Sequence, residues 1–311
     1  MIRYSLMFVF AICLQINNAS AQSTKEATEL VKEYTNLEEA LKNPKSVLRL
    51  NLSEVQLKIA DSTWSKFTHL QYLSLKNDHL KQIPAGVGNL KTLKVLDLSG
   101  NDFKVLPTTF TNLTNLQELF INDDQFFDLE KNIPILSALP SLITLHLEND
   151  GLKVLPANTS KLDHLESLYL NNNLFTQIPS DVGNLKTLKV LDLSGNEFKV
   201  LPTTFSKLTN LKELYINDDQ KFELEQNIPI LSALPNLTTL HLENDGLEVL
   251  PANTSKLKRI ESLYLNNNQF KQVPPEIKEL DNLKFVDFHD NKFTIPMQDI
   301  ENHSFGVKIR F

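Results

Sequence analysis

The sequence predicts an α/β repeat solenoid, in which short parallel strands alternate with turns or short helical segments. Three observations support this prediction. Apolar residues recur with a period of 23 residues from Val47 onward. Within each period they alternate in the way that one face of a strand requires. A block of 95 residues also occurs twice in succession. A fixed period of about 20–50 residues is typical of architectures whose units stack on one another.

The N-terminus has the three parts of a secretory signal peptide. Arg3 supplies a positive charge, Leu6–Leu14 is an apolar run, and Ala19–Ala21 reads Ala-Ser-Ala, a cleavage signal. The apolar run is much shorter than the ~20 residues that span a bilayer. We interpret residues 1–21 as a signal peptide cleaved after Ala21, rather than as an ordinary first strand or helix. The mature chain is then exported to the periplasm, the cell surface or the medium.

The cysteine content and the net charge limit the classes of function that the mature chain can have. The single cysteine, Cys13, lies inside the predicted signal peptide, so the mature chain has no disulfide and no thiolate site. A lipid anchor on Cys13 is a minor alternative, which the bulky Ile12 before it disfavours. The formal net charge of −7 disfavours a nucleic-acid binder, whose affinity rests on Lys and Arg.

Residues 22–46 are expected to form an N-terminal helical cap. An amphipathic helix is predicted between Thr24 and Asn43, and Pro44 would end it. Its apolar positions are Leu30, Val31, Tyr34, Leu37 and Leu41. Such a helix would cover the open end of the first repeat unit, where core side chains and a sheet edge are otherwise exposed.

Eleven repeat units follow between Val47 and the C-terminus. Their first residues are 23 positions apart except at two places, where the spacing is 26: Val47, Leu70, Leu93, Leu116, Leu142, Leu165, Leu188, Leu211, Leu237, Ile260 and Leu283. In the unit that begins at Leu70, Leu73 and Leu75 point to one side of a strand and Ser74 to the other. The strand has ended by Pro84, because proline cannot donate to a ladder. One unit cannot bury its leucines alone, so stacked units must share a core.

The pattern LxxLxLxxNxL followed by xxLPxxxxxLxxL resembles the leucine-rich repeat family in its 23-residue "LP" form, over residues 47–311. The resemblance implies a curved horseshoe with a parallel sheet on the concave face and turns or short helices on the convex face. It also implies a non-enzymatic recognition module, similar to exported bacterial leucine-rich repeat proteins. The family's asparagine at the ninth position is aspartate in five units, and an ionised aspartate cannot donate as an amide does. These are Asp78, Asp124, Asp150, Asp219 and Asp245.

The block 71–165 returns as 166–260 with 71 of 95 positions identical. The stretch VGNLKTLKVLDLSGN is unchanged between Val87–Asn101 and Val182–Asn196. Its Leu and Val letters fall on framework positions, so the identity indicates duplication of scaffold rather than a catalytic signature. Each copy contains one 26-residue unit, expanded by three residues around Asp123–Pro134 and Asp218–Pro229.

The C-terminal residues are predicted to close the other end of the solenoid. Val307–Phe311 reads VKIRF, which favours a last strand. The aromatic residues expected around it are Phe285, Phe288, Phe293 and Phe305. We therefore expect the solenoid to start and stop within this chain, without a second catalytic domain.

Candidate binding residues stand at the fifth position of each unit, which is expected to face the concave side. From the third unit to the eleventh they are Asp97, Phe120, His146, Tyr169, Asp192, Tyr215, His241, Tyr264 and Asp287. Aromatic side chains on an exposed sheet suit the recognition of a protein or a sugar. The alternative interpretation is that these rings only support neighbouring strands by cross-strand packing.

We predict that a protein partner binds this face, and that it has basic character because the flanking positions are mostly acidic. A rival hypothesis is a structural or glycan-binding protein of the cell envelope, similar to an adhesin, in which the aromatic residues are support only.

Catalytic, cofactor and metal sites are not predicted. Asp97 and His146 stand two strands apart, ~10 Å, which is too far for a direct hydrogen bond. His146 and His241 are four strands apart, ~19 Å, and cannot share one metal ion. The pairs Asp123–Asp124 and Asp218–Asp219 offer oxygen ligands for a weak calcium site, but we interpret them as solvated acidic turns because they lack regular ligand spacing.

Overall fold

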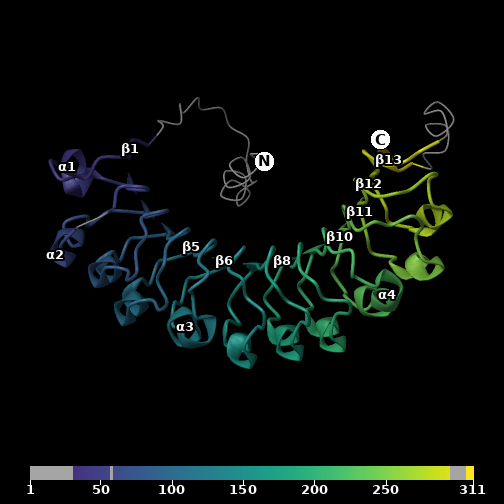
Figure 1. Ribbon diagram of the computed structural model, residues 1–311, viewed down its shortest axis with the longest axis horizontal. Coiled ribbons are helices and arrows are strands. Elements are labelled where there is room, and N and C mark those ends of the chain that lie inside the picture. The colour runs from purple at the N-terminus through teal and green to yellow at the C-terminus, as the bar shows by residue number, and fades with distance from the viewer. Residues whose placement is uncertain (1–30, 57–58, 295–305) are drawn as a thin grey trace, which may run out of the picture. The chain divides into compact units, whose positions relative to one another are not determined.

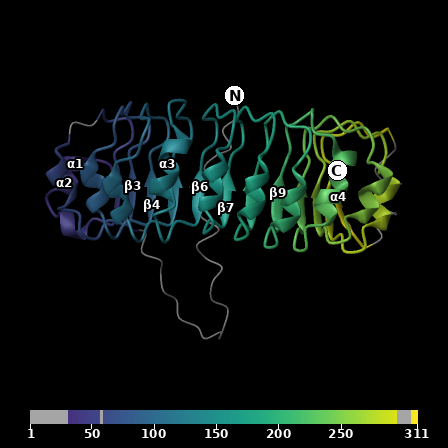
Figure 2. The same cartoon turned by 90° about the horizontal axis from the view of Figure 1, so that it is seen from below.

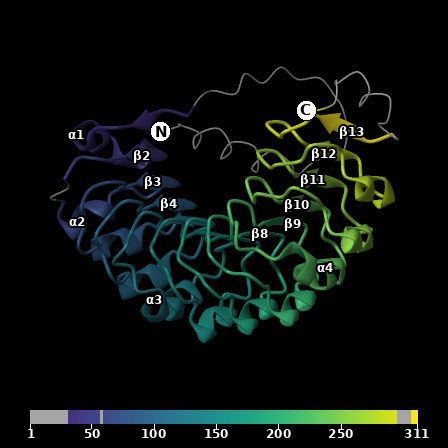
Figure 3. The same ribbon diagram turned by 45° about the vertical axis from the view of Figure 1, so that its right-hand side comes forward.

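The computed structural model describes residues 31–56, 59–294 and 306–311. Contacts divide the chain into two units, 1–31 and 32–311, and the second contains every strand and helix of the described residues. The predicted signal peptide, 1–21, lies outside the described residues, as does the first part of the predicted cap. The second unit is built on a single open sheet of thirteen parallel strands, arranged in chain order (Figures 1 and 3).

Each strand from β2 to β12 pairs in parallel with the strand before it and the strand after it. In chain order the strands are β1 (Glu33–Tyr34), β2 (Arg49–Asn51), β3 (Tyr72–Ser74), β4 (Val95–Asp97), β5 (Glu118–Phe120), β6 (Thr144–His146), β7 (Ser167–Tyr169), β8 (Val190–Asp192), β9 (Glu213–Tyr215), β10 (Thr239–His241), β11 (Ser262–Tyr264), β12 (Phe285–Asp287) and β13 (Lys308–Arg310). This confirms the α/β repeat solenoid with a parallel sheet.

The leucines of the repeat form one continuous core behind the sheet. In β4, Leu96 is fully buried, whereas Val95 and Asp97 on either side remain partly exposed. Leu98, which follows the strand, is fully buried as well. Each such leucine stabilises the fold by about 1.5–3 kcal/mol. The leucine positions of the repeat are therefore framework, as the alternation predicts.

Short helices lie on the side of each unit opposite the strands (Figures 1 and 2). The α-helices are α1 (Leu37–Ala40), α2 (Asp61–Trp64), α3 (Leu129–Leu136) and α4 (Leu224–Ser232). The 3₁₀ helices are η2 (Pro44–Ser46), η3 (Ala85–Asn89), η4 (Thr108–Asn112), η5 (Ala157–Lys161), η6 (Ser180–Asn184), η7 (Thr203–Lys207), η8 (Ala252–Lys256) and η9 (Pro275–Glu279). Among the described residues, no helix combines the length and the apolar character needed to cross a bilayer.

The two 26-residue units use their three extra residues to build α3 and α4 in place of a 3₁₀ turn. Asp128 caps α3 by accepting the N–H of Lys131. The buried Asn132 accepts the N–H of Leu106 at 2.7 Å and donates to the carbonyl oxygens of Lys104 and Asp128. The side-chain amide of Asn132 thus connects α3 to the preceding unit by hydrogen bonds.

The N-terminal cap differs from the predicted continuous helix. Over the described part of residues 24–43, the chain forms β1 and then the single turn α1, which Asn36 caps. The reason is the open edge of β2: Glu33 and Tyr34 pair with Arg49 and Leu50, which satisfies backbone groups that a helix would leave unpaired. The cap is therefore a strand followed by a short helix.

The C-terminal end agrees with the prediction of a last strand. β13 pairs with β12 in parallel. Phe311 packs on Phe288 and Phe293, with ring centroids 6.3 and 5.4 Å away. Phe305, also expected in this cap, lies outside the described residues.

The ninth position of the units forms a buried ladder. Nδ2 of Asn101 donates to the carbonyl oxygens of Leu75 and Leu98 at 2.9 and 2.7 Å, and its Oδ1 accepts the N–H of Asp78. In Asp150, Oδ1 likewise accepts a backbone N–H, from Asp124 at 2.8 Å. Oδ2 of Asp150 takes the place of the amide nitrogen, and no described residue bonds to it although it is buried.

Burial raises the pKa of Asp150 to about 8, and it raises the pKa of Asp245, its counterpart in the second copy, to about 8 as well. A protonated carboxyl group donates through its O–H as an amide donates through its N–H. At these two positions aspartate can thus replace asparagine at neutral pH without burying a charge.

Candidate functional site

All nine predicted binding residues lie in one line across the concave face. Each is the last residue of its strand, from Asp97 in β4 to Asp287 in β12, and the strands keep one register. Asp97, for example, pairs with Phe120, and Phe120 pairs with His146. We call this line the central column.

Two groups of three rings occupy most of the central column. Phe120, His146 and Tyr169 form the first triad, with ring centroids 4.0 and 4.5 Å apart and planes within 13° of parallel. Tyr215, His241 and Tyr264 form the second triad, with centroids 3.8 and 4.2 Å apart in the same order. Each triad is an imidazole stacked between two aromatic rings.

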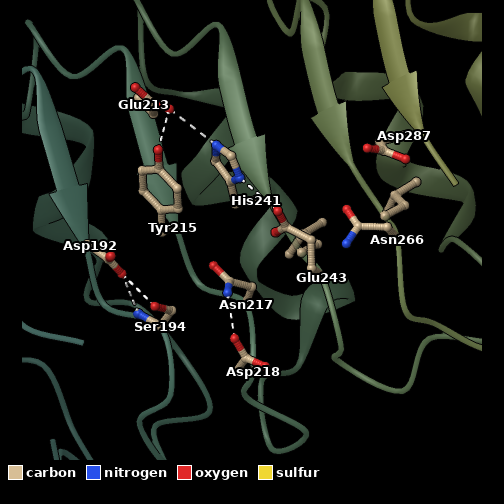
Figure 4. A network of polar contacts seen from close by, with 12 residues as sticks. Asp192, Ser194, Glu213, Tyr215, Asn217, Asp218, His241, Glu243, Asn266 and Asp287 are labelled. Carbon is tan, nitrogen blue, oxygen red and sulfur yellow. Dashed lines mark hydrogen bonds and ion pairs between the residues drawn. The ribbon is translucent and has the colours of Figure 1, made fainter. Parts of the chain in front are cut away.

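Two glutamates hold the imidazole of each triad. Nε2 of His146 lies 3.0 Å from Oε1 of Glu118, and Nδ1 lies 3.0 Å from Oε1 of Glu148. In the second copy, Glu213 and Glu243 contact His241 at 3.2 and 2.9 Å (Figure 4). Glu118 and Glu213 join each histidine to the preceding strand, and the two glutamates of each triad together fix the plane of the imidazole ring.

The two imidazoles are buried, with His146 9% and His241 7% exposed. Burial lowers the pKa of His146, but the hydrogen bonds to Glu118 and Glu148 outweigh it and leave the pKa at about 8. The same opposing effects raise the pKa of His241. At neutral pH the first triad therefore holds an imidazolium between Glu118 and Glu148.

The alternation in the sequence predicts that these histidines lie on the concave face, but it does not reveal that other side chains cover their rings. The rings of the neighbouring strands cover both faces of each imidazole, and the glutamates cover both nitrogens. The sequence does contain a signal for the contacts between the glutamates and the histidine nitrogens. Glu148 follows His146 by two residues, and Glu118 stands two residues before Phe120 on the adjacent strand. Residues two apart in a strand point to the same side.

The aspartates of the central column bond to residues close in sequence. Oδ1 of Asp192 accepts the N–H and the hydroxyl of Ser194 at 2.9 and 2.6 Å (Figure 4). Asp97 bonds in the same way to Ser99, at 3.0 and 2.6 Å. Asp97 and His146 do not bond to each other, because each is engaged with other partners.

The acidic turns are also engaged in structural contacts. Oδ1 of Asp123 accepts the amide of Asn149 at 2.6 Å, and Oδ1 of Asp124 accepts the N–H of Phe126. Within the described ranges, no group of three or more His, Cys, Asp or Glu side chains is placed to hold a metal ion.

Comparison with known proteins identifies the repeat. A model of the leucine-rich repeat region matches residues 45–150 and 125–239, and a single leucine-rich repeat matches 259–280. The chain belongs to the leucine-rich repeat family. Leucine-rich repeat proteins are typically non-enzymatic scaffolds, and the family supports a repeat module for protein–protein interaction.

Solved structures of leucine-rich repeat proteins resemble the chain. An internalin (inlF) of Listeria monocytogenes is 22% identical, with a TM-score of 0.52 over 86% of this chain and 88% of its own, and it shares the fold. A leucine-rich repeat protein of Leptospira interrogans is also 22% identical, over 90% of this chain and 100% of its own, with a TM-score of 0.36. No curated protein matches the chain.

Proposed function

We propose that this leucine-rich repeat protein is an exported, non-enzymatic recognition module that binds a protein partner of basic character through its concave face. The observation that carries the proposal is the central column, where aromatic rings and carboxylates share one surface. Aromatic side chains give a large contact area at a low cost in conformational entropy, and they are enriched among residues that dominate binding energy. Cross-strand packing accounts for the stacked faces of the rings, but it does not require the carboxylates around them.

The acidic side chains support a basic partner. Each triad has two glutamates beside one histidine, so an excess of negative charge remains even when the imidazole is protonated. Asp97 and Asp192 add further carboxylates to the same column. Complementary charge steers association and excludes partners of like charge.

Affinity capture with matched variants tests the proposal. The purified protein captures its partner, and Tyr169→Ala/Tyr215→Ala on the concave face abolishes capture. The control, Lys91→Ala/Lys186→Ala, changes residues on the approach to the strands and leaves capture intact. Equal capture by all three proteins would exclude the concave face. Binding to a glycan array without a captured protein would favour the structural or glycan-binding hypothesis instead.

A further inference from the structure

Three aspartates of the central column recur at intervals of 95 residues: Asp97, Asp192 and Asp287. In each, Oδ1 accepts the backbone N–H of the residue two positions later, at 3.0, 2.9 and 3.1 Å. The aspartates differ in the side chains that flank them on the adjacent strands. The flanking pairs, in order, are Ser74 with Phe120, Tyr169 with Tyr215, and Tyr264 with Arg310.

The rings of Tyr169 and Tyr215 both turn one face toward Asp192. Tyr169 stacks its other face on His146, with 2° between the planes, and Tyr215 stacks its other face on His241, with 14°. These imidazoles belong to β6 and β10, so the remaining ring faces point at β8, which lies between β7 and β9. The two rings therefore stand on either side of Asp192, each with one face toward β8. We call Tyr169, Asp192 and Tyr215 the tyrosine slot.

The spacing of the strands gives the tyrosine slot the width of one flat group. Inside each triad, two outer rings that are two strands apart enclose an imidazole, at centroid steps of 3.8–4.5 Å. Tyr169 and Tyr215 are also two strands apart, roughly 9 Å. Asp192 is shorter than histidine and carries no ring to fill the space between them. A planar group as thin as an imidazole therefore fits between the two tyrosines.

At the base of the slot, Oδ2 of Asp192 accepts no hydrogen bond from the described residues. Ser194 bonds to Oδ1 of Asp192 only, and no other described residue donates to Oδ2. Burial raises the pKa of Asp192 to about 6, so its carboxyl group is ionised at pH 7.5. Glu148 adds to this rise in the pKa and His241 opposes it, so charged groups of both signs act on Asp192.

At the other two aspartates the chain itself supplies a donor to Oδ2. The hydroxyl of Ser74 donates to Asp97 at 3.4 Å. Nη1 of Arg310 donates to Asp287 at 3.3 Å, beside Tyr264. At Asp287 a guanidinium group of the chain itself thus meets the carboxylate, from the strand position that Tyr215 holds beside Asp192.

The concave face also shows how a guanidinium meets a tyrosine, because that of Arg49 lies over the ring of Tyr72 at 3.9 Å. A guanidinium is planar and always charged; it stacks on aromatic faces while its N–H groups bond to a carboxylate. We propose that the tyrosine slot binds the guanidinium group of an arginine side chain of the protein partner, stacked between Tyr169 and Tyr215 and paired with Asp192. This inference rests on the proposed function, that the concave face binds a protein.

Arginine suits the tyrosine slot better than lysine does. The ammonium group of lysine is compact and strongly hydrated, and it presents no plane that could stack on two ring faces at once. Two aromatic ring faces and one carboxylate oxygen instead match a flat cation with donors along its edge.

A titration with small probes tests the slot without any knowledge of the partner. Nα-acetyl-arginine amide is titrated into the purified protein, whose tyrosine rings carry ¹³C labels, and NMR follows both molecules. Stacking between two rings shifts the side-chain protons of the probe upfield and perturbs the signals of Tyr169 and Tyr215. The corresponding citrulline and lysine amides should bind at least several-fold more weakly, because one lacks the charge and the other the plane.

The duplicated block supplies matched variants. Asp192→Asn keeps the shape of the slot and should weaken arginine binding about tenfold, whereas Asp97→Asn in the identical stretch should leave it unchanged. Tyr169→Phe should retain binding, because only the ring is required. Ser74→Tyr adds the missing wall beside Asp97 and should create a second binding site.

Equal affinity for arginine and citrulline, or equal loss from Asp192→Asn and Asp97→Asn, would overturn the arginine assignment. Circular dichroism melting of each variant separates loss of binding from loss of folding. If the probe fails to bind while the concave variants still lose the captured partner, the tyrosine slot is wrong and the proposed function stands. If the probe binds but capture is unaffected by the concave variants, the proposed function is wrong.

Discussion

The two copies of the duplicated block contain the same fifteen residues around Asp97 and Asp192, yet the two aspartates have different surroundings. Both make the same bonds to the serine two positions later. The side chain one unit earlier is Ser74 in the first copy and Tyr169 in the second. In a solenoid with one strand per unit, the surroundings of a residue are set by residues about 23 positions away as much as by its neighbours in sequence.

The framework of the two copies, by contrast, is the same. Asn132 and Asn227 make equivalent bonds to the preceding unit, with 2.7 and 2.8 Å to the N–H that each accepts. Phe103 and Phe198 are fully buried, and each meets a second phenylalanine edge-on at 5.8 Å. The copies therefore differ on the concave face and agree in the core, and variants of either region can break or sharpen this contrast.

The largest effect is expected in the shared core. Phe103→Ala and Phe198→Ala each remove a fully buried ring and should lower the free energy of unfolding by about 3–5 kcal/mol. Because the surroundings are equivalent, the two losses should agree within about 0.5 kcal/mol. Urea denaturation followed by circular dichroism measures both. A difference of several kcal/mol would show that the copies are not equivalent in their framework.

The next effect concerns the buried ladder. The pKa of Asp150 is about 8 in the folded protein, above the value of about 3.9 for an unfolded chain. The neutral carboxyl therefore contributes stability that is fully present below pH ~4 and is lost as the pH rises through about 8. Asp150→Asn should raise the free energy of unfolding by about 1–3 kcal/mol at pH 9 and by much less at pH 5, because most of the loss in the native protein falls between pH 5 and pH 8.

Asp245→Asn should reproduce this result in the second copy, since its pKa is also about 8. The exposed Asp281 supplies the control: it pairs with Lys258 rather than with a histidine, so Asp281→Asn should change stability equally little at both pH values. Thermal melting between pH 5 and pH 9 measures all three. A stabilisation by Asp150→Asn that is the same at pH 5 and pH 9 would refute the protonated carboxyl.

A smaller effect separates the two triads. Tyr215 donates its hydroxyl to Glu213 at 2.6 Å, whereas Phe120 at the equivalent place has no hydroxyl. Tyr215→Phe should therefore cost about 1 kcal/mol, and Phe120→Tyr should recover a similar amount beside Glu118. Denaturant titration of the two variants and their combination measures this. Destabilisation by Phe120→Tyr would show that the first triad lacks space for the bond.

The smallest effect is expected on the surface. Phe126 is 63% exposed and its counterpart is Lys221. Phe126→Lys should change the free energy of unfolding by no more than about 0.5 kcal/mol. Thermal melting checks this, and a loss above roughly 1 kcal/mol would mean that the ring supports α3.

The sequence predicted the fold from local regularities that have direct physical causes. The 23-residue period predicted where the strands lie, because each row of leucines must be buried by the next unit. The alternation of residues such as Leu96 and Asp97 predicted which side chains form the central column. The N-terminal cap was wrong as a continuous helix, since Glu33 and Tyr34 pair with a strand edge that helical periodicity does not reveal.

The details of the site were less accessible from the sequence. The contacts of His146 with Glu118 and Glu148 depend on side-chain rotamers across neighbouring strands. The two roles of Asp97 and Asp192 depend on the residue one unit earlier. Neither follows from the type of residue at a single position.

The arrangement of one short strand per unit has a mechanical consequence. Each strand bonds only to the strands of the preceding and following units. Tension applied between the two ends of the sheet should therefore peel units away one at a time, beginning at a terminal strand, rather than shear the whole sheet at once. Every 23-residue unit that detaches would release about 80 Å of extended chain. A protein held at both ends could thus lengthen in steps of one repeat while its remaining units keep their fold.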